Sequence, residues 1–163
     1  MKAQEMLFWL MGTLGYYEYS TLGWFVAAVL VLVVALQAFS GNLNALVIGE
    51  SGATQLGVDV EVAKRFVFLV ASALVGLAVS VSGLIGFVGL MVPHLARLML
   101  GPDHRLLLPA ATVLGGAFLV LADLVARLAF VVAGSEPPVG VITAFLGGPF
   151  FLLLLRRRRR YVV

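Results

Sequence analysis

Long runs of apolar residues separated by short polar connections dominate this sequence, and they restrict it to folds that a lipid bilayer can solvate. Hydrophobic residues make up 62% of the 163 residues, charged residues make up only 12%, and the mean hydropathy is +1.10. An α-helix crosses a bilayer core about 30 Å thick with roughly 20 apolar residues. The sequence therefore predicts an all-α integral membrane protein with about five transmembrane helices.

Five apolar segments are predicted to be the spans. They are residues 21–39, 66–81, 84–100, 106–132 and 139–155. The third is interrupted by Pro93, which removes a backbone donor, and we expect this span to be short and broken. The segment between the first two spans carries several charges and glycines, so we expect it to lie outside the membrane core.

The distribution of positive charge predicts the orientation. Nine of the eleven Lys and Arg residues would lie on one side if the basic tail 156–163 were cytoplasmic, which satisfies the positive-inside rule. A polybasic run directly after an apolar helix is a membrane anchor, so we predict contact with lipid and no nucleic-acid binding. Five spans then place residues 1–20 outside as a segment preceding the transmembrane domain 21–163, and we expect a preceding part of the polypeptide to be missing.

Residues 43–58 form an amphipathic segment between the first two spans. Its small or apolar residues lie close to one helical face: Leu46, Gly49, Ala53, Leu56 and Gly57. Glu50 and Gln55 add polar contacts, and small residues permit the close approach of another surface. The pattern predicts a short cytoplasmic helix that fits a groove on a partner protein. An interfacial helix that lies on the bilayer without a partner is the alternative.

Arg127 is predicted near the outer end of the fourth span, with Asp123 one helical turn before it. A charged residue in an apolar span is costly unless it reaches the interface or a partner. Two interpretations remain open and are compatible with each other. The residues form an internal ion pair, or the arginine is presented to another protein.

No residue pattern predicts catalysis, a cofactor or a metal site. His94 lacks nearby partner ligands, and neither a Walker motif nor a catalytic triad is present. Pro93 and Pro149 are expected to have structural roles. Gly86, Gly89 and Gly147 are predicted sites of close helix packing.

Several motifs in order resemble the FecCD/BtuC-type permease family of ABC importers, over practically the whole chain. They are residues 8–14, 43–57, 82–97, 101–105, 121–127, 138–144 and 147–151. The motif at 43–57 is similar to the family's version of the EAA motif. The resemblance implies a permease for iron-siderophore, haem or cobalamin in the cell inner membrane.

This resemblance further implies a ten-helix subunit in which the five spans correspond to helices six to ten. Such a subunit works as a homodimer, with ABC ATPase subunits that hydrolyse ATP and a periplasmic or lipoprotein substrate-binding protein. The ATPase would contact residues 43–58, including Glu50, and the binding protein would contact Arg127. The competing hypothesis is a truncated, non-transporting membrane scaffold that oligomerises without a complete pathway.

Overall fold

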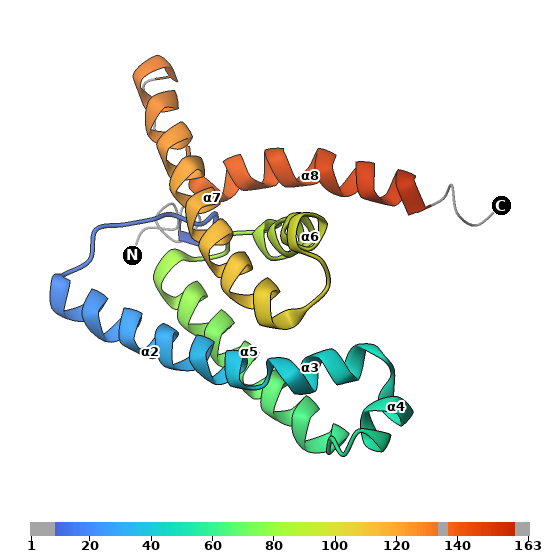
Figure 1. The fold of residues 1–163 in the computed structure, drawn as a ribbon. Coiled ribbons are helices and arrows are strands. Elements are labelled where there is room, and N and C mark those ends of the chain that lie inside the picture. The colour runs from blue at the N-terminus through green and yellow to red at the C-terminus, as the bar shows by residue number, and fades with distance from the viewer. Residues whose placement is uncertain (1–8, 134–136, 159–163) are drawn as a thin grey trace.

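The computed structural model describes residues 9–133 and 137–158, and all regular structure within them is helical (Figure 1). The helices are α2 (Tyr19–Ala38), α3 (Ser40–Val47), α4 (Glu50–Gln55), α5 (Val60–Ser82), α6 (Val88–Leu100), α7 (His104–Ala133) and α8 (Val139–Arg158). The predicted all-α class is confirmed.

Three of these helices are long and apolar enough to cross a membrane. They are α2, α5 and the first 26 residues of α7, His104–Ala129. These three segments coincide with the first, second and fourth predicted spans. Helices α6 and α8 coincide with the third and fifth predicted spans but contain shorter apolar segments, Val88–Leu100 and Val139–Leu154. The 13 residues of α6 extend over only about 20 Å at 1.5 Å per residue.

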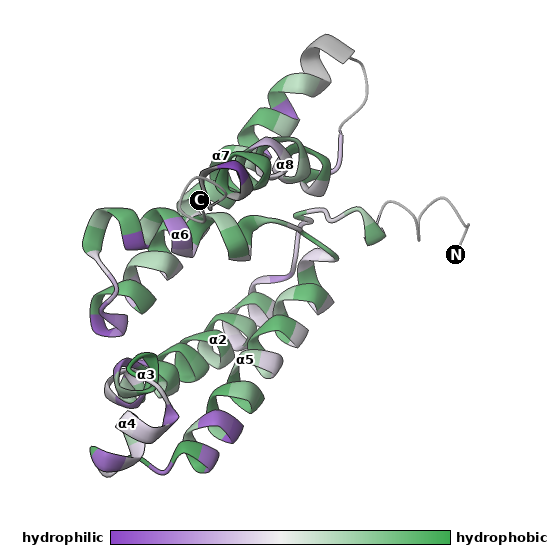
Figure 2. Ribbon diagram, turned by 90° about the vertical axis from the view of Figure 1, so that its right-hand side faces the viewer, coloured by the Kyte–Doolittle hydropathy of each residue, from purple (hydrophilic) through white to green (hydrophobic). Residues whose placement is uncertain are grey.

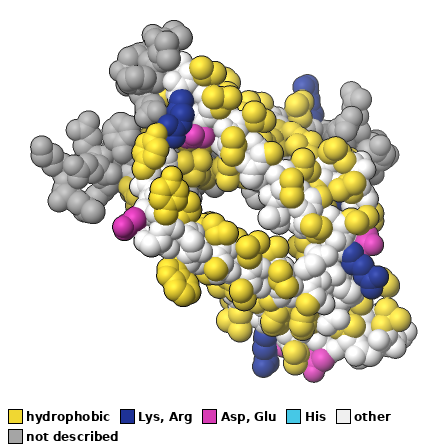
Figure 3. All heavy atoms as spheres, turned by 60° about the vertical axis from the view of Figure 1, so that its left-hand side comes forward, with side chains coloured by type: hydrophobic (Ala, Val, Ile, Leu, Met, Phe, Trp, Pro, Cys, Tyr) yellow, Lys and Arg dark blue, Asp and Glu magenta, His cyan; other side chains and the backbone are white. Residues whose placement is uncertain are grey.

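The helices form two groups, which Figure 2 shows as separate layers. Helix α2 packs against α5, with α3 and α4 attached to them, whereas α6, α7 and α8 pack against one another. Helices α2 and α3 also contact α7. Apolar side chains are spread over the whole described part of the face shown in Figure 3, and that face is hollowed near its centre. No residue of α2 is buried, and large apolar side chains such as Trp24, Leu30 and Val31 are exposed on it, which suits contact with lipid or with other transmembrane helices.

A polar clamp, consisting of Asn44, Asp103, His104 and Arg105, joins the two groups at what we call the α4 end. The Asn44 amide nitrogen donates to the Asp103 carboxylate at 2.6 Å, and the Asn44 oxygen accepts from the His104 backbone N–H at 2.8 Å. Asp103 also accepts from the Arg105 backbone N–H at 2.9 Å. Because the first N–H groups of a helix lack partners within it, these bonds both cap α7 and attach it to α3.

A strap formed by residues 9–18 joins the groups at the opposite end, which we call the Arg127 end. The Thr13 N–H donates to the Ser82 carbonyl at the end of α5, at 2.9 Å. The Gly12 carbonyl accepts from the Gly140 N–H at the start of α8, at 3.3 Å. Since a β-carbon at Gly140 would collide with the strap backbone, this contact requires glycine.

The predicted packing glycines differ in their surroundings. A β-carbon at Gly147 would overlap the side chain of Phe87, which precedes α6 and has a φ of 66°. A β-carbon at Gly86 or Gly89 would meet no described atom within 4 Å, so their packing role stays a prediction. Pro93 lies inside α6. Pro149 lies inside α8 and is exposed.

We expect Gly147→Ala to destabilise the protein by about 1–3 kcal/mol, because the added methyl group overpacks the contact between α8 and Phe87. Gly148→Ala is the matched control, since its β-carbon meets no described atom within 4 Å. Unfolding of both variants in the same detergent measures the difference. Equal stability of the two variants would contradict the close approach at Gly147.

The polar clamp should also make stability depend on pH. The Arg105 backbone N–H, and then the Asn44 amide, lower the pKa of Asp103 below its ordinary value. A lowered pKa in the folded state means that the stabilisation is present above the unfolded-state pKa and is lost as pH falls through the folded-state pKa. Acidification from neutral pH to about pH 3 should therefore lower the unfolding temperature more in the wild type than in Asp103→Asn. Parallel pH profiles would argue against the clamp.

Candidate functional site

Two surfaces at opposite ends of the molecule contain the residues that the sequence predicts to contact partner proteins. At the α4 end, two glycines with positive φ bound the short helix α4. Gly49 ends the connection from α3 with a φ of 110°, and Gly57 follows α4 with a φ of 80°. Residues other than glycine rarely adopt these backbone angles, so both positions favour glycine. The glycines set the direction in which α4 leaves and returns to the fold.

The inner side of α4 is held by a small apolar cluster. Ala45, Ala53 and Val60 are buried together, with Leu46 and Val58 packed against them. Ala53 is 0% exposed, so it faces the fold and offers no surface to a partner. Small residues therefore bring α3, α4 and the start of α5 close together. The helical face predicted to contact a partner is therefore in part an internal packing surface, formed by Ala53 and Leu46.

Polar contacts then connect α4 to α5. The Lys64 ammonium lies 2.5 Å from the Glu50 carboxylate. The Asp59 carboxylate caps α5 by accepting from the Val62 backbone N–H at 3.1 Å. Both charged side chains of the ion pair are largely exposed, so the pair adds little stability and mainly orients the helix.

The outward side of this segment carries an exposed apolar patch, which we call the α4 patch: Val47, Ile48 and Leu56. These residues are 65%, 70% and 65% exposed. Leu56 belongs to the predicted face, whereas the sequence interpretation did not select Val47 and Ile48. Their apolar character at the end of α3, just before Gly49, was the signal that could have identified them.

At the opposite end, Arg127 reaches the surface from α7 and is held by two polar partners. Its Nε donates to the Asp123 carboxylate at 2.7 Å, and its Nη1 donates to the Tyr16 hydroxyl at 3.2 Å. The guanidinium carbon also lies 5.8 Å from the centre of the Tyr16 ring, within the range of a cation–π contact. The internal ion pair, one of the two interpretations left open by the sequence, is therefore present, and Tyr16 is a partner that the sequence did not indicate.

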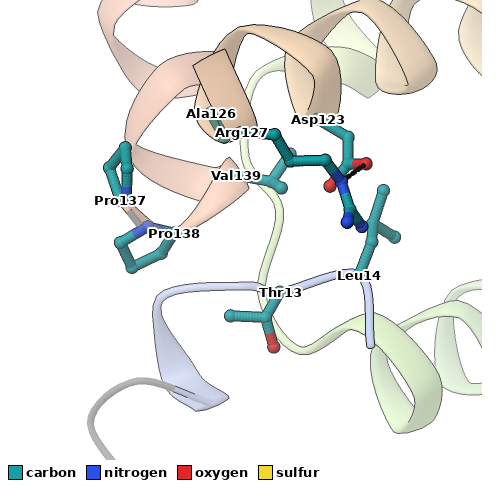
Figure 4. A pocket seen from close by; sticks show the side chains of 8 residues that line it. All are labelled: Thr13, Leu14, Asp123, Ala126, Arg127, Pro137, Pro138 and Val139. Carbon is teal, nitrogen blue, oxygen red and sulfur yellow. Dashed lines mark hydrogen bonds and ion pairs between the residues drawn. The ribbon is translucent and has the colours of Figure 1, made fainter. Parts of the chain in front are cut away.

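A pocket of about 290 Å³ opens beside this arginine (Figure 4). Its lining combines strap, α7 and the start of α8: Thr13, Leu14, Asp123, Ala126, Arg127, Pro137, Pro138 and Val139. Of its apolar lining residues, Ala126 and Val139 belong to a buried cluster with Ala122, against which Leu14 packs. The pocket therefore presents the Arg127 guanidinium, paired with Asp123, beside apolar side chains. The remaining N–H groups of the guanidinium suit an acidic side chain with its methylene groups.

His, Asp and Glu side chains are scattered over the described part of the chain. No three His, Asp or Glu side chains gather there as metal ligands would. His94 instead packs edge-on against Phe150, with ring centres 5.9 Å apart.

The fold and the two surfaces define a polytopic helical membrane protein. The chain belongs to the FecCD transport family, whose sequence model matches residues 1–157. This confirms the resemblance to FecCD/BtuC-type permeases.

Individual relatives are also similar over most of the chain. The cobalamin import system permease protein BtuC of Halobacterium salinarum is 50% identical over 89% of this chain and 38% of its own length. The hemin transport system permease protein HmuU of Yersinia pestis is 45% identical over 91% of this chain and 44% of its own length.

A solved structure described as an inward-facing conformation of a metal-chelate type ABC transporter superposes with a TM-score of 0.81 at 35% identity. It covers 94% of this chain, and the chain covers 50% of it. The chain thus spans half or less of the length of these relatives.

Proposed function

We propose that this chain forms helices of the permease subunit of a binding-protein-dependent ABC importer for iron-siderophore, haem or cobalamin. Membership of the FecCD transport family supports the class, and the cobalamin and hemin permeases among its relatives support the range of substrates. The permease contributes to the translocation path, and partner ATPase subunits hydrolyse ATP. The observation that carries the proposal is the pair of exposed surfaces at opposite ends of helices long enough to cross a membrane.

In this proposal, the α4 patch docks into the ATPase subunit. Val47, Ile48 and Leu56 supply apolar area, and Gly57 beside them leaves room for the ATPase to approach. Ala53 and Leu46 act indirectly by fixing α4 on the buried cluster. Glu50 acts through its ion pair with Lys64. Closure of the ATPase dimer would then displace α4, and α3 would transmit the movement through the polar clamp to α7.

Gly57→Arg should abolish capture of a cognate ATPase subunit when the two proteins are co-expressed and purified through a tag on the permease. The reason is that a long charged side chain would fill the space beside the α4 patch. Gly57→Ala is the matched control, because it imposes the same strain at a φ of 80° without the bulk. Retention of the ATPase by Gly57→Arg would refute the coupling surface, and equal loss in both variants would assign the effect to the backbone.

The Arg127 site is proposed to receive the substrate-binding protein. Its guanidinium is exposed beside a pocket that suits an acidic side chain. Arg–carboxylate pairs at an interface steer association and fix register. This placement requires the Arg127 end to be external and the α4 end to be cytoplasmic, in agreement with the positive charges of Lys64, Arg65, Arg97 and Arg105 near the α4 end.

Arg127→Glu should weaken binding of the cognate substrate-binding protein at least about tenfold, because it places like charges opposite each other. Surface-immobilised permease in nanodiscs measures the affinity. Arg65→Glu reverses an exposed charge near the other end and should leave that affinity unchanged. An unaltered affinity in Arg127→Glu would exclude this docking site.

The remaining parts of the proposal concern assembly and location. We place the protein in the cell inner membrane with its C-terminus in the cytoplasm, in contact with lipid and with a second permease copy. The exposed apolar side chains of α2, such as Trp24, Leu30 and Val31, support contact with lipid or with other transmembrane helices.

A further inference from the structure

We infer that Tyr16 is a positioning residue, which holds the Arg127 guanidinium in one orientation for the carboxylate of an incoming protein. This inference rests on the proposed docking function of Arg127. It extends that function to a residue 111 positions away in the sequence.

The bonds of the guanidinium define what Tyr16 contributes. Arginine has five N–H donors in one plane. Asp123 accepts from Nε and Tyr16 accepts from Nη1, which fixes the plane from two sides. Among the described residues, no acceptor forms a hydrogen bond with the other N–H groups of Arg127. Those donors are available to a carboxylate, for which the planar fork of arginine is the matching geometry.

Asp123 alone cannot fix this orientation. A single bond at Nε leaves the side chain free to turn about that bond, and the arginine side chain is 42% exposed. The Tyr16 hydroxyl and ring add a second and a third contact, at 3.2 Å and at 5.8 Å from the ring centre. Restricting the guanidinium before binding removes an entropy loss that association would otherwise incur.

Tyr16 can act in this way because its backbone is anchored on both sides. The Thr13 N–H is bonded to Ser82, and the Tyr17 hydroxyl donates to the Val81 carbonyl, so the strap is attached to α5 on either side of Tyr16. Tyr16 itself is 93% exposed and contributes almost nothing to a core. Its contacts with Arg127 are the side-chain interactions that it makes within the described residues.

The pocket indicates the chemistry of the incoming group. Leu14, Ala126 and Val139 give it an apolar floor below the guanidinium. A glutamate side chain satisfies both parts, since its methylene groups lie on the floor and its carboxylate reaches the free donors. A peptide of six glutamates is accordingly a suitable probe.

Nuclear magnetic resonance of the arginine side chains in the full chain tests the inference. The Arg127 signal is assigned from Arg127→Lys. In the wild type we expect slow rotation about the Nε–Cζ bond and separate Nη signals. Tyr16→Phe should speed this rotation, because it keeps the ring and removes the hydroxyl acceptor. It should also weaken binding of the hexaglutamate peptide about three- to tenfold.

Tyr19→Phe is the matched control, since it removes the hydroxyl of a nearby tyrosine that is 92% exposed, and among the described residues this hydroxyl makes no hydrogen bond. It should leave both measurements unchanged. Unaltered Arg127 rotation in Tyr16→Phe, or equal effects of the two variants, would overturn the positioning function. The rotation measurement needs no partner, so the two proposals can fail separately. Unaltered rotation in Tyr16→Phe, together with weaker receptor binding by Arg127→Glu, would overturn the positioning function alone. Faster rotation in Tyr16→Phe, together with unaltered receptor binding by Arg127→Glu, would count against the docking proposal alone.

Discussion

The structure depends on one constraint, that backbone polar groups removed from water must find partners within the protein. Helices satisfy the constraint along their length, but their ends leave free N–H and C=O groups. Here those groups are used to join segments. Asn44 satisfies the first N–H of α7, and the strap satisfies carbonyls of Val81 and Ser82 at the end of α5. The same interactions therefore cap the helices and help to connect the two helical groups.

Hydropathy was sufficient to predict the class of fold and the three longest spans, because apolar length is a local property. It failed at the start of α6, which begins at Val88 and not at residue 84. Residues 84–87 are as apolar as the helix, but the chain turns there through Gly83 and Phe87, both with positive φ. Packing of Phe87 against Gly147 is a long-range contact that hydropathy cannot reveal.

The same distinction applies to the candidate sites. The charge and spacing of Arg127 and Asp123 made their pairing predictable, since residues four apart share a helix face. Tyr16 could not be found in this way, because only the folded strap brings it to α7. Ala53 was predicted to share a face with Leu46 and Leu56, but within α4 it points to the inner side and is buried. The helical face alone could not separate the two sides of so short a helix.

The difference in length between α2 and α7 has a consequence for how the two helical groups are spaced. Helix α2 has 20 residues, about 30 Å, and contacts α5 and α7 through only part of its surface, with no side chain fully buried. Helix α7 has 30 residues, about 45 Å, and is packed against α6 and α8, so a bilayer accommodates it by tilt of the whole group. Membrane thickness thus acts differently on the two groups. The lipid composition of the host membrane becomes a determinant of the angle between them, and of the strain borne by the clamp and the strap.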